Sequence, residues 1–126
     1  MTPPTYEDLV AIVSKKNFPE NSAKGFKLKV GAEVFLGVVV RKQDRYYAYR
    51  NLCRHLPIPI DLNYEGNFFN YSKTHLQCHM HGALYEPETG LCTEGPCQGE
   101  SLVPLKLEEE PDRLVIRIPR ELVGND

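Results

Sequence analysis

The alternation of apolar and polar positions predicts β-strands in the first half of the chain. Apolar side chains alternate with polar ones over residues 26–30, which is the pattern of a strand with one buried face. Residues 33–42 form a run rich in β-branched side chains, and residues 46–50 continue as the returning strand. Residues 42–45, between these runs, have the composition of a hairpin turn. We therefore expect an antiparallel hairpin in this part of the chain.

The same period of two returns near the end of the chain. Apolar residues recur over 102–107 and again over 114–118, and residues 108–112 between them form a polar turn. We expect these strands to join those of the first half in one antiparallel body. Regular alternation stops over residues 51–100, where Pro, Gly, Asn, Cys and His become frequent. This segment is expected to be a site built from loops and inserted between the strands.

The pattern near the start of the chain leaves two alternatives open. Apolar residues between 6 and 13 fit one stripe of a helix, and Thr5 with Asp8 would suit its first turn. The other alternative is a short strand over residues 10–14. Residues 18–25 have the composition of a loop.

Length and composition indicate one soluble globular domain over residues 1–126. Hydrophobic residues make up 41% and charged residues 25%, and the net charge of −2 gives no basic surplus for nucleic acid or an anionic membrane. The longest apolar run, residues 34–40, is far shorter than the roughly 20 residues that span a bilayer. The first residues lack the basic and apolar regions of a secretory signal. We expect a cytoplasmic monomer.

The cysteines and histidines gather in the irregular segment. In a cytoplasmic protein, such a cluster indicates metal or redox chemistry more than a disulfide framework. All of these residues lie between positions 53 and 97: Cys53, Cys78, Cys92 and Cys97, with His55, His75, His79 and His81.

Two short motifs carry the chemistry. Cys53 and His55 form C-x-H, and after 22 residues Cys78 and His81 form C-x-x-H. Thiolates suit iron bound to sulfide, and neutral imidazoles suit a less negative, more oxidising iron. Two Cys and two His therefore fit a 2Fe–2S cluster in which one iron has two Cys ligands and the other has two His ligands.

Further residues give the chain a clear resemblance to the Rieske iron–sulfur family. Residues 78–85 (CHMHGALY) are similar to the family's C-x-x-H-G-x-x-[FY] loop, Thr89 and Gly90 to its T-G turn, and residues 95–97 (GPC) to the Gly-Pro loop that covers the cluster. The resemblance runs from about residue 26 to residue 118. It implies an all-β Rieske fold, an antiparallel β-sandwich base with a small cluster-binding subdomain at about 51–100, and it favours a strand over residues 10–14.

The resemblance also implies the ligands. Cys53 and Cys78 would hold the buried iron, and His55 and His81 the outer iron. The spacing favours His81 over His79, because adjacent side chains cannot easily turn onto separate irons. His79 is then expected to be a solvent-facing bystander. His75 precedes residue 76 on an expected strand, and we expect it to have a surface or hydrogen-bonding role.

Several alternatives accompany this interpretation. A structural zinc site also takes two Cys and two His, although a zinc knuckle has no use for the Gly-Pro loop. The site would be vestigial if the domain were only an interaction module. Cys92 and Cys97 are expected to be free thiols, and the alternative for them is a disulfide across the covering loop. The first loop departs from the family at residues 56–59, and the 22-residue gap is longer than in many members, with the extra length expected over residues 62–73.

The implied function is one-electron transfer by a soluble Rieske-type ferredoxin, which is not itself an enzyme. The partners would be a reductase and a ring-hydroxylating oxygenase or similar acceptor, docking around the histidine tips with Arg54, Pro57 and Pro96. The alternatives are a Rieske-like small subunit of a multi-component reductase, such as nitrite reductase, and a non-catalytic redox-sensing or interaction module.

The resemblance finally bears on the reduction potential, which in Rieske clusters spans roughly −150 to +300 mV. High-potential members have a Ser where this chain has Ala83, a Tyr at the position of Tyr85, and a disulfide whose cysteines are replaced here by Ile58 and Met80. We expect Tyr85 to donate to Cys78 and the potential to lie in the lower half of the range.

Overall fold

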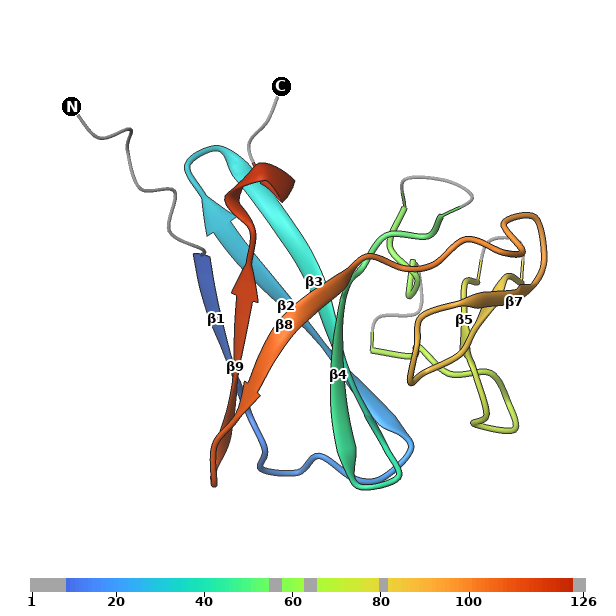
Figure 1. The fold of residues 1–126 in the computed structure, drawn as a ribbon, viewed down its shortest axis with the longest axis horizontal. Coiled ribbons are helices and arrows are strands. Elements are labelled where there is room, and N and C mark those ends of the chain that lie inside the picture. The colour runs from blue at the N-terminus through green and yellow to red at the C-terminus, as the bar shows by residue number, and fades with distance from the viewer. Residues whose placement is uncertain (1–8, 55–57, 63–65, 80–81, 124–126) are drawn as a thin grey trace.

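The computed structural model describes residues 9–54, 58–62, 66–79 and 82–123, and these residues form two antiparallel β-sheets (Figure 1). The larger sheet has the strand order β1-β9-β8-β4-β3-β2, and the smaller one the order β5-β6-β7. The elements are β1 (Leu9–Ser14), β2 (Ser22–Val30), β3 (Glu33–Lys42), β4 (Arg45–Arg50), β5 (Leu76–Gln77), β6 (Leu84–Tyr85), β7 (Cys92–Glu94), β8 (Pro104–Glu109), β9 (Arg113–Ile118) and the 3₁₀-helix η1 (Arg120–Leu122).

The larger sheet folds over itself as two layers. One layer is β1-β9-β8 and the other is β4-β3-β2, and they are joined where Ala48 and Tyr49 of β4 pair with Leu105 and Pro104 of β8. In Figure 1, β1 and β9 lie on the left, and β8 crosses over β2 and β3 on its way to β4. The core between the layers contains the inward side chains of both, including Ala11, Val13, Phe35, Val39, Leu114 and Ile116. The predicted β-sandwich base, with the last hairpin packed on the N-terminal strands, is confirmed.

The predicted elements agree closely with the observed ones, with one correction. The N-terminal segment is a strand, β1, and the turn between β3 and β4 has Gln43 and Asp44 in the left-handed region, as tight hairpins require. The loop expected over residues 18–25 was too long, because β2 already begins at Ser22. Residues 22–25 have weak strand propensity, but they pair with residues 38–41 of β3, and this tertiary pairing outweighs the local preference.

A second core lies between the β3–β4 hairpin and the segment inserted between β4 and β8. Val38 and Val40 point to this outer core, whereas Val39 points into the sandwich, so β3 is buried on both faces. That explains its continuous apolar run. The outer core holds the cysteines of the inserted segment, which lies to the right of the sandwich in Figure 1. Among the described residues, no helix is long and apolar enough to cross a membrane.

Candidate metal centre

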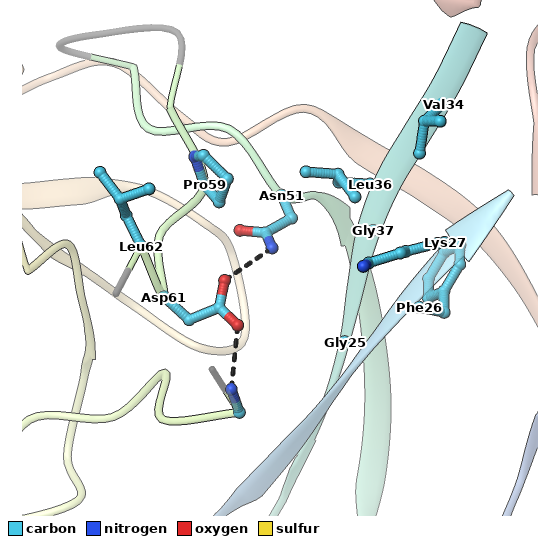
Figure 2. Close-up of a pocket in the computed structure, with 11 residues that line it drawn as sticks. Gly25, Phe26, Lys27, Val34, Leu36, Gly37, Asn51, Pro59, Asp61 and Leu62 are labelled. Carbon is cyan, nitrogen blue, oxygen red and sulfur yellow. Dashed lines mark hydrogen bonds between the residues drawn. The ribbon is translucent and has the colours of Figure 1, made fainter. Parts of the chain in front are cut away.

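The first motif lies in a short closed loop directly after β4. Cys53 is buried, and its N–H donates to the carbonyl of Ile58 at 2.7 Å, which closes the chain on itself. Asn51, a buried polar residue, supports the loop through two side-chain hydrogen bonds. Its Oδ1 accepts the N–H of Ile60 at 2.8 Å, and its Nδ2 donates to Oδ1 of Asp61 at 3.1 Å (Figure 2).

The second motif lies in a loop of the same design after β5. Cys78 is also buried, and its N–H donates to the carbonyl of Ala83 at 2.9 Å. The N–H of Gly82, whose φ of +72° suits glycine, donates back to the carbonyl of Cys78 at 2.9 Å. In both loops a buried cysteine therefore bonds to the carbonyl five residues further along. The N–H of His79 joins the loops by donating to the carbonyl of Ile60 at 3.3 Å.

The structure describes only part of the expected ligand set. Cys53 and Cys78 are described, whereas His55 and His81 lie outside the described residues, as do Pro57 and Met80. Within the described ranges, no three Cys, His, Asp or Glu side chains converge on a position for a metal ion. The assignment of the four ligands stays a prediction.

The rings of the other two histidines, His75 and His79, form hydrogen bonds with other residues of the chain. His75 Nδ1 lies 2.9 Å from Oγ1 of Thr74, which agrees with the hydrogen-bonding role expected of it. His79 Nε2 lies 2.9 Å from the carbonyl oxygen of Asn67, so in that contact the ring nitrogen donates. His79 is partly exposed, and the bond to Asn67 ties its ring to the segment that precedes β5; that it is not a cluster ligand stays a prediction.

Tyr85 of β6 brings a hydroxyl to the first loop. Its side chain is fully buried, its oxygen accepts the N–H of Arg54 at 2.9 Å, and it lies 3.3 Å from Cys53 Sγ. The sequence suggested Cys78 as its sulfur partner. The hydroxyl lies instead at the cysteine of the first loop, because the ring reaches across from β6 to the chain that follows β4. Burial, and then the hydrogen bond with Cys53, raise the pKa of Tyr85 well above its ordinary value.

The Gly-Pro loop lies directly against the second motif. Gly95 has φ +105°, and a Cβ at this position would be 2.8 Å from Cα of Ala83. Only glycine allows so close an approach of the two backbones. Glu100, which follows this loop, forms an ion pair with Arg54 of the first loop, with 3.3 Å between Nη2 and Oε1. Residues 92–100, which we call the covering segment, thus contact both motifs.

Cys92 and Cys97 are free and buried in the covering segment, and the prediction of free thiols is confirmed. Their sulfurs are 3.1 Å apart, and Cys97 Sγ also lies 3.1 Å from the hydroxyl of Tyr85. Cys92 Sγ donates to the carbonyl of Glu94 at 3.2 Å. Burial raises the pKa of Cys92 to about 12, so this thiol keeps its proton at neutral pH.

The described residues fit the thiolate half of an iron–sulfur centre. Two buried thiols, Cys53 and Cys78, lie in equivalent and connected loops, and the Tyr85 hydroxyl beside Cys53 is available to offset the negative charge that sulfur carries when it binds iron. The sequence analysis missed the structural roles of two residues near this centre, Asn51 and Cys97. Asn51 gave no signal in a period-two pattern, and Cys97 was noted only as a thiol, although its position after Gly95 and Pro96 indicated the covering loop.

A groove of about 980 Å³ lies beside the first loop, between the β2–β3 hairpin and residues 59–62 (Figure 2). Its walls are largely apolar, with Phe26 and Leu36 on the sheet side and Pro59 opposite. The Asp61 carboxylate is already engaged by Asn51 and by the N–H of Gly66. The groove therefore borders the support of the first loop, and its polar group serves that support.

Comparisons with known proteins agree with this geometry. The family model described as Rieske [2Fe-2S] domain matches residues 8–112. None of the curated proteins matches the sequence.

Solved structures share the fold. The ferredoxin of carbazole 1,9a-dioxygenase from Nocardioides aromaticivorans IC177 matches with a TM-score of 0.63 and 20% identity, over 87% of this chain and 97% of that chain. A complex of reduced oxygenase and oxidized ferredoxin in carbazole 1,9a-dioxygenase contains a chain that matches with a TM-score of 0.68 and 18% identity, over 87% and 94% of the two chains. The terminal oxygenase of carbazole 1,9a-dioxygenase from Novosphingobium sp. KA1 gives 0.66 and 17%, over 96% of this chain but 31% of that chain.

Proposed function

This chain belongs to the Rieske [2Fe-2S] domain family, and from that premise we propose that it is a ferredoxin that carries single electrons from a reductase to an oxygenase or a similar acceptor. The family implies one Rieske-type 2Fe–2S cluster. The observation that carries the proposal is the pair of equivalent closed loops, each beginning at a buried cysteine, within a domain match that covers residues 8–112.

The share of each chain that is matched supports a carrier. The match extends over 97% of the ferredoxin from Nocardioides aromaticivorans IC177, but over only 31% of the terminal oxygenase from Novosphingobium sp. KA1. The complex of an oxygenase with a ferredoxin shows that a protein of this fold serves an oxygenase in that system. An oxygenase is therefore the acceptor class that we propose here.

In this proposal the cluster is held by Cys53 and Cys78 on one iron and by His55 and His81 on the other. When bound, it supplies reversible one-electron oxidation and reduction. The chain's own residues keep the two thiolates buried, fix the loops through the bonds to Ile58 and Ala83, and present the Tyr85 hydroxyl to the Cys53 sulfur.

We place the docking face around the described end of the first loop and the covering loop. Arg54 and Pro96 are exposed there, and the ion pair with Glu100 balances the charge of Arg54. A nearly neutral, small contact suits the brief encounters of an electron carrier, whose interfaces are at the small end of the range.

The proposal is tested by an anaerobic dithionite titration followed by mixing with terminal oxygenases. We expect uptake of one electron per chain, followed by reoxidation when an oxygenase with its own oxidised Rieske cluster is added. Uptake of one electron with transfer only to a nitrite-reductase-type catalytic subunit would favour the small-subunit alternative. Turnover of an organic substrate with O₂ by this chain alone would contradict the carrier role.

A further inference from the structure

A line of short contacts runs from the first motif into the covering segment. The Tyr85 hydroxyl lies 3.3 Å from Cys53 Sγ and 3.1 Å from Cys97 Sγ, and it accepts the N–H of Arg54 at 2.9 Å. Cys97 Sγ lies 3.1 Å from Cys92 Sγ, and Cys92 donates to the carbonyl of Glu94 at 3.2 Å. Tyr85, Cys97 and Cys92 are all almost completely shielded from solvent.

Counting protons leaves three ways to arrange these bonds. The hydroxyl of Tyr85 has one proton, which goes either to Cys53 or to Cys97. The thiol of Cys97 also has one proton, which goes either to Tyr85 or to Cys92. The far end is fixed, because the carbonyl of Glu94 can only accept and therefore takes the proton of Cys92. In the first, Tyr85 donates to Cys53 and Cys97 donates to Cys92; in the second, Tyr85 donates to Cys53 and Cys97 donates to Tyr85; in the third, Tyr85 donates to Cys97 and Cys97 donates to Cys92.

The charge on Cys53 and the strength of the two acceptors near Cys97 decide between these arrangements. A cysteine that binds iron is a thiolate, which carries negative charge and can only accept. A hydrogen bond to a charged acceptor is roughly twice as strong as one between neutral groups. The Tyr85 proton therefore points to Cys53. The Cys97 proton can reach the Tyr85 oxygen or the Cys92 sulfur, both at 3.1 Å, and the oxygen is the better acceptor because thiol sulfur accepts only weakly. The hydroxyl oxygen then accepts both the Arg54 N–H and the Cys97 thiol, and two donors on one oxygen polarise its own O–H bond.

We propose that Cys97 is a positioning residue for the Tyr85 hydroxyl: by donating its thiol proton to the tyrosine oxygen, it directs the hydroxyl proton onto the Cys53 sulfur. This inference rests on the proposed function, in which Cys53 is a cluster ligand. A stronger donor to the thiolate stabilises the more negative, reduced state. Cys97 thus raises the reduction potential of the centre without touching a proposed ligand.

The test is voltammetry on Cys97→Ala with Cys92→Ala as the matched control. Both variants truncate a buried thiol in the same segment, but only Cys97 contacts Tyr85 among the contacts described above. We expect Cys97→Ala to lower the equilibrium constant for reduction about threefold, or about 30 mV at 59 mV per tenfold for one electron. Cys92→Ala should leave the potential unchanged, and Cys97→Ser, which restores a donor, should recover it.

A double-mutant cycle separates positioning from general loosening of the loop. In a Tyr85→Phe background, Cys97→Ala should no longer change the potential, because the hydroxyl through which it acts is missing. A rise in potential in Cys97→Ala would mean that Cys97 competes for the proton, and an unchanged potential would mean that the two groups are not coupled. Either result overturns the inference. A wild-type protein with no iron–sulfur spectrum would instead overturn the proposed function.

Discussion

Replacing Asn51 by alanine should loosen the first loop, because Asn51 supplies two hydrogen bonds to the residues that follow that loop. Asn51 and Ile60 are both buried, and the amide oxygen of Asn51 accepts the N–H of Ile60 at 2.8 Å. Without that acceptor, a buried N–H loses its partner, at about 1–3 kcal/mol. The bond from Asn51 Nδ2 to the Asp61 carboxylate at 3.1 Å is lost as well, which adds about 1 kcal/mol. The expected destabilisation is about 2–4 kcal/mol.

A protein that loses its cofactor on unfolding does so irreversibly, and its stability is then described by the rate of unfolding. The assay should therefore measure that rate. We would follow the visible absorbance of the cluster at a fixed urea concentration. If 2 kcal/mol appears wholly in the unfolding step, bleaching becomes about 30-fold faster, and we expect a factor of at least about ten.

Asn70→Ala is the matched control. Asn70 Oδ1 likewise accepts two backbone N–H groups, those of Thr74 at 2.9 Å and His75 at 3.1 Å, but in a turn near the surface where water can replace it. Its effect should be less than about threefold. Equal bleaching rates for Asn51→Ala and Asn70→Ala would refute the argument that burial of the Asn51–Ile60 bond holds the loop.

Three further predictions concern the covering segment and the docking face. Gly95→Ala should accelerate bleaching of the cluster, because φ is +105° and the new Cβ would lie 2.8 Å from Cα of Ala83. Gly99→Ala, with φ +94° and open space around it, should accelerate bleaching less, and equal bleaching rates would contradict the close approach. Cys92, with its pKa raised to about 12, should resist iodoacetamide in the folded protein at pH 8, as followed by peptide mass spectrometry, and rapid labelling of the native protein would contradict this. Its contribution to stability is present below its ordinary pKa of 9.0 and should be lost as the pH rises toward 12. Ile58→Glu should slow electron transfer to the acceptor in stopped-flow experiments without changing the cluster spectrum, and an unchanged rate would move the docking face elsewhere.

The strands could be predicted because one buried face imposes a period of two on the sequence. The hairpin of β3 and β4 was located to within a residue from its β-branched run and its polar turn. Val38, Val39 and Val40 break that period, and only the structure explains why: the inserted segment covers the second face of β3. The start of β2 was missed since residues 22–25 become a strand through their partner β3 and not through their own propensity.

In the candidate metal centre, too, some residues could be predicted from the sequence and others could not. Cys53 and Cys78, which begin the two closed loops, could be singled out from the sequence because metal ligands are restricted in residue type and spacing. The partner of Tyr85 was not, because contact with Cys53 rather than Cys78 depends on how β6 crosses the first loop, and nothing in the local sequence encodes that. Asn51 was missed for a related reason. Its importance comes from the buried N–H of Ile60, which lies nine residues further along the chain.

The most direct test of the account is pulsed EPR on the reduced protein after labelling with ¹⁵N-histidine. We predict hyperfine coupling from two histidine nitrogens bound to one cluster, unchanged in His79→Ala, and loss of the cluster in His55→Ala and in His81→Ala. A spectrum without histidine coupling, or a His79→Ala protein that loses the cluster while His81→Ala keeps it, would contradict the proposed centre.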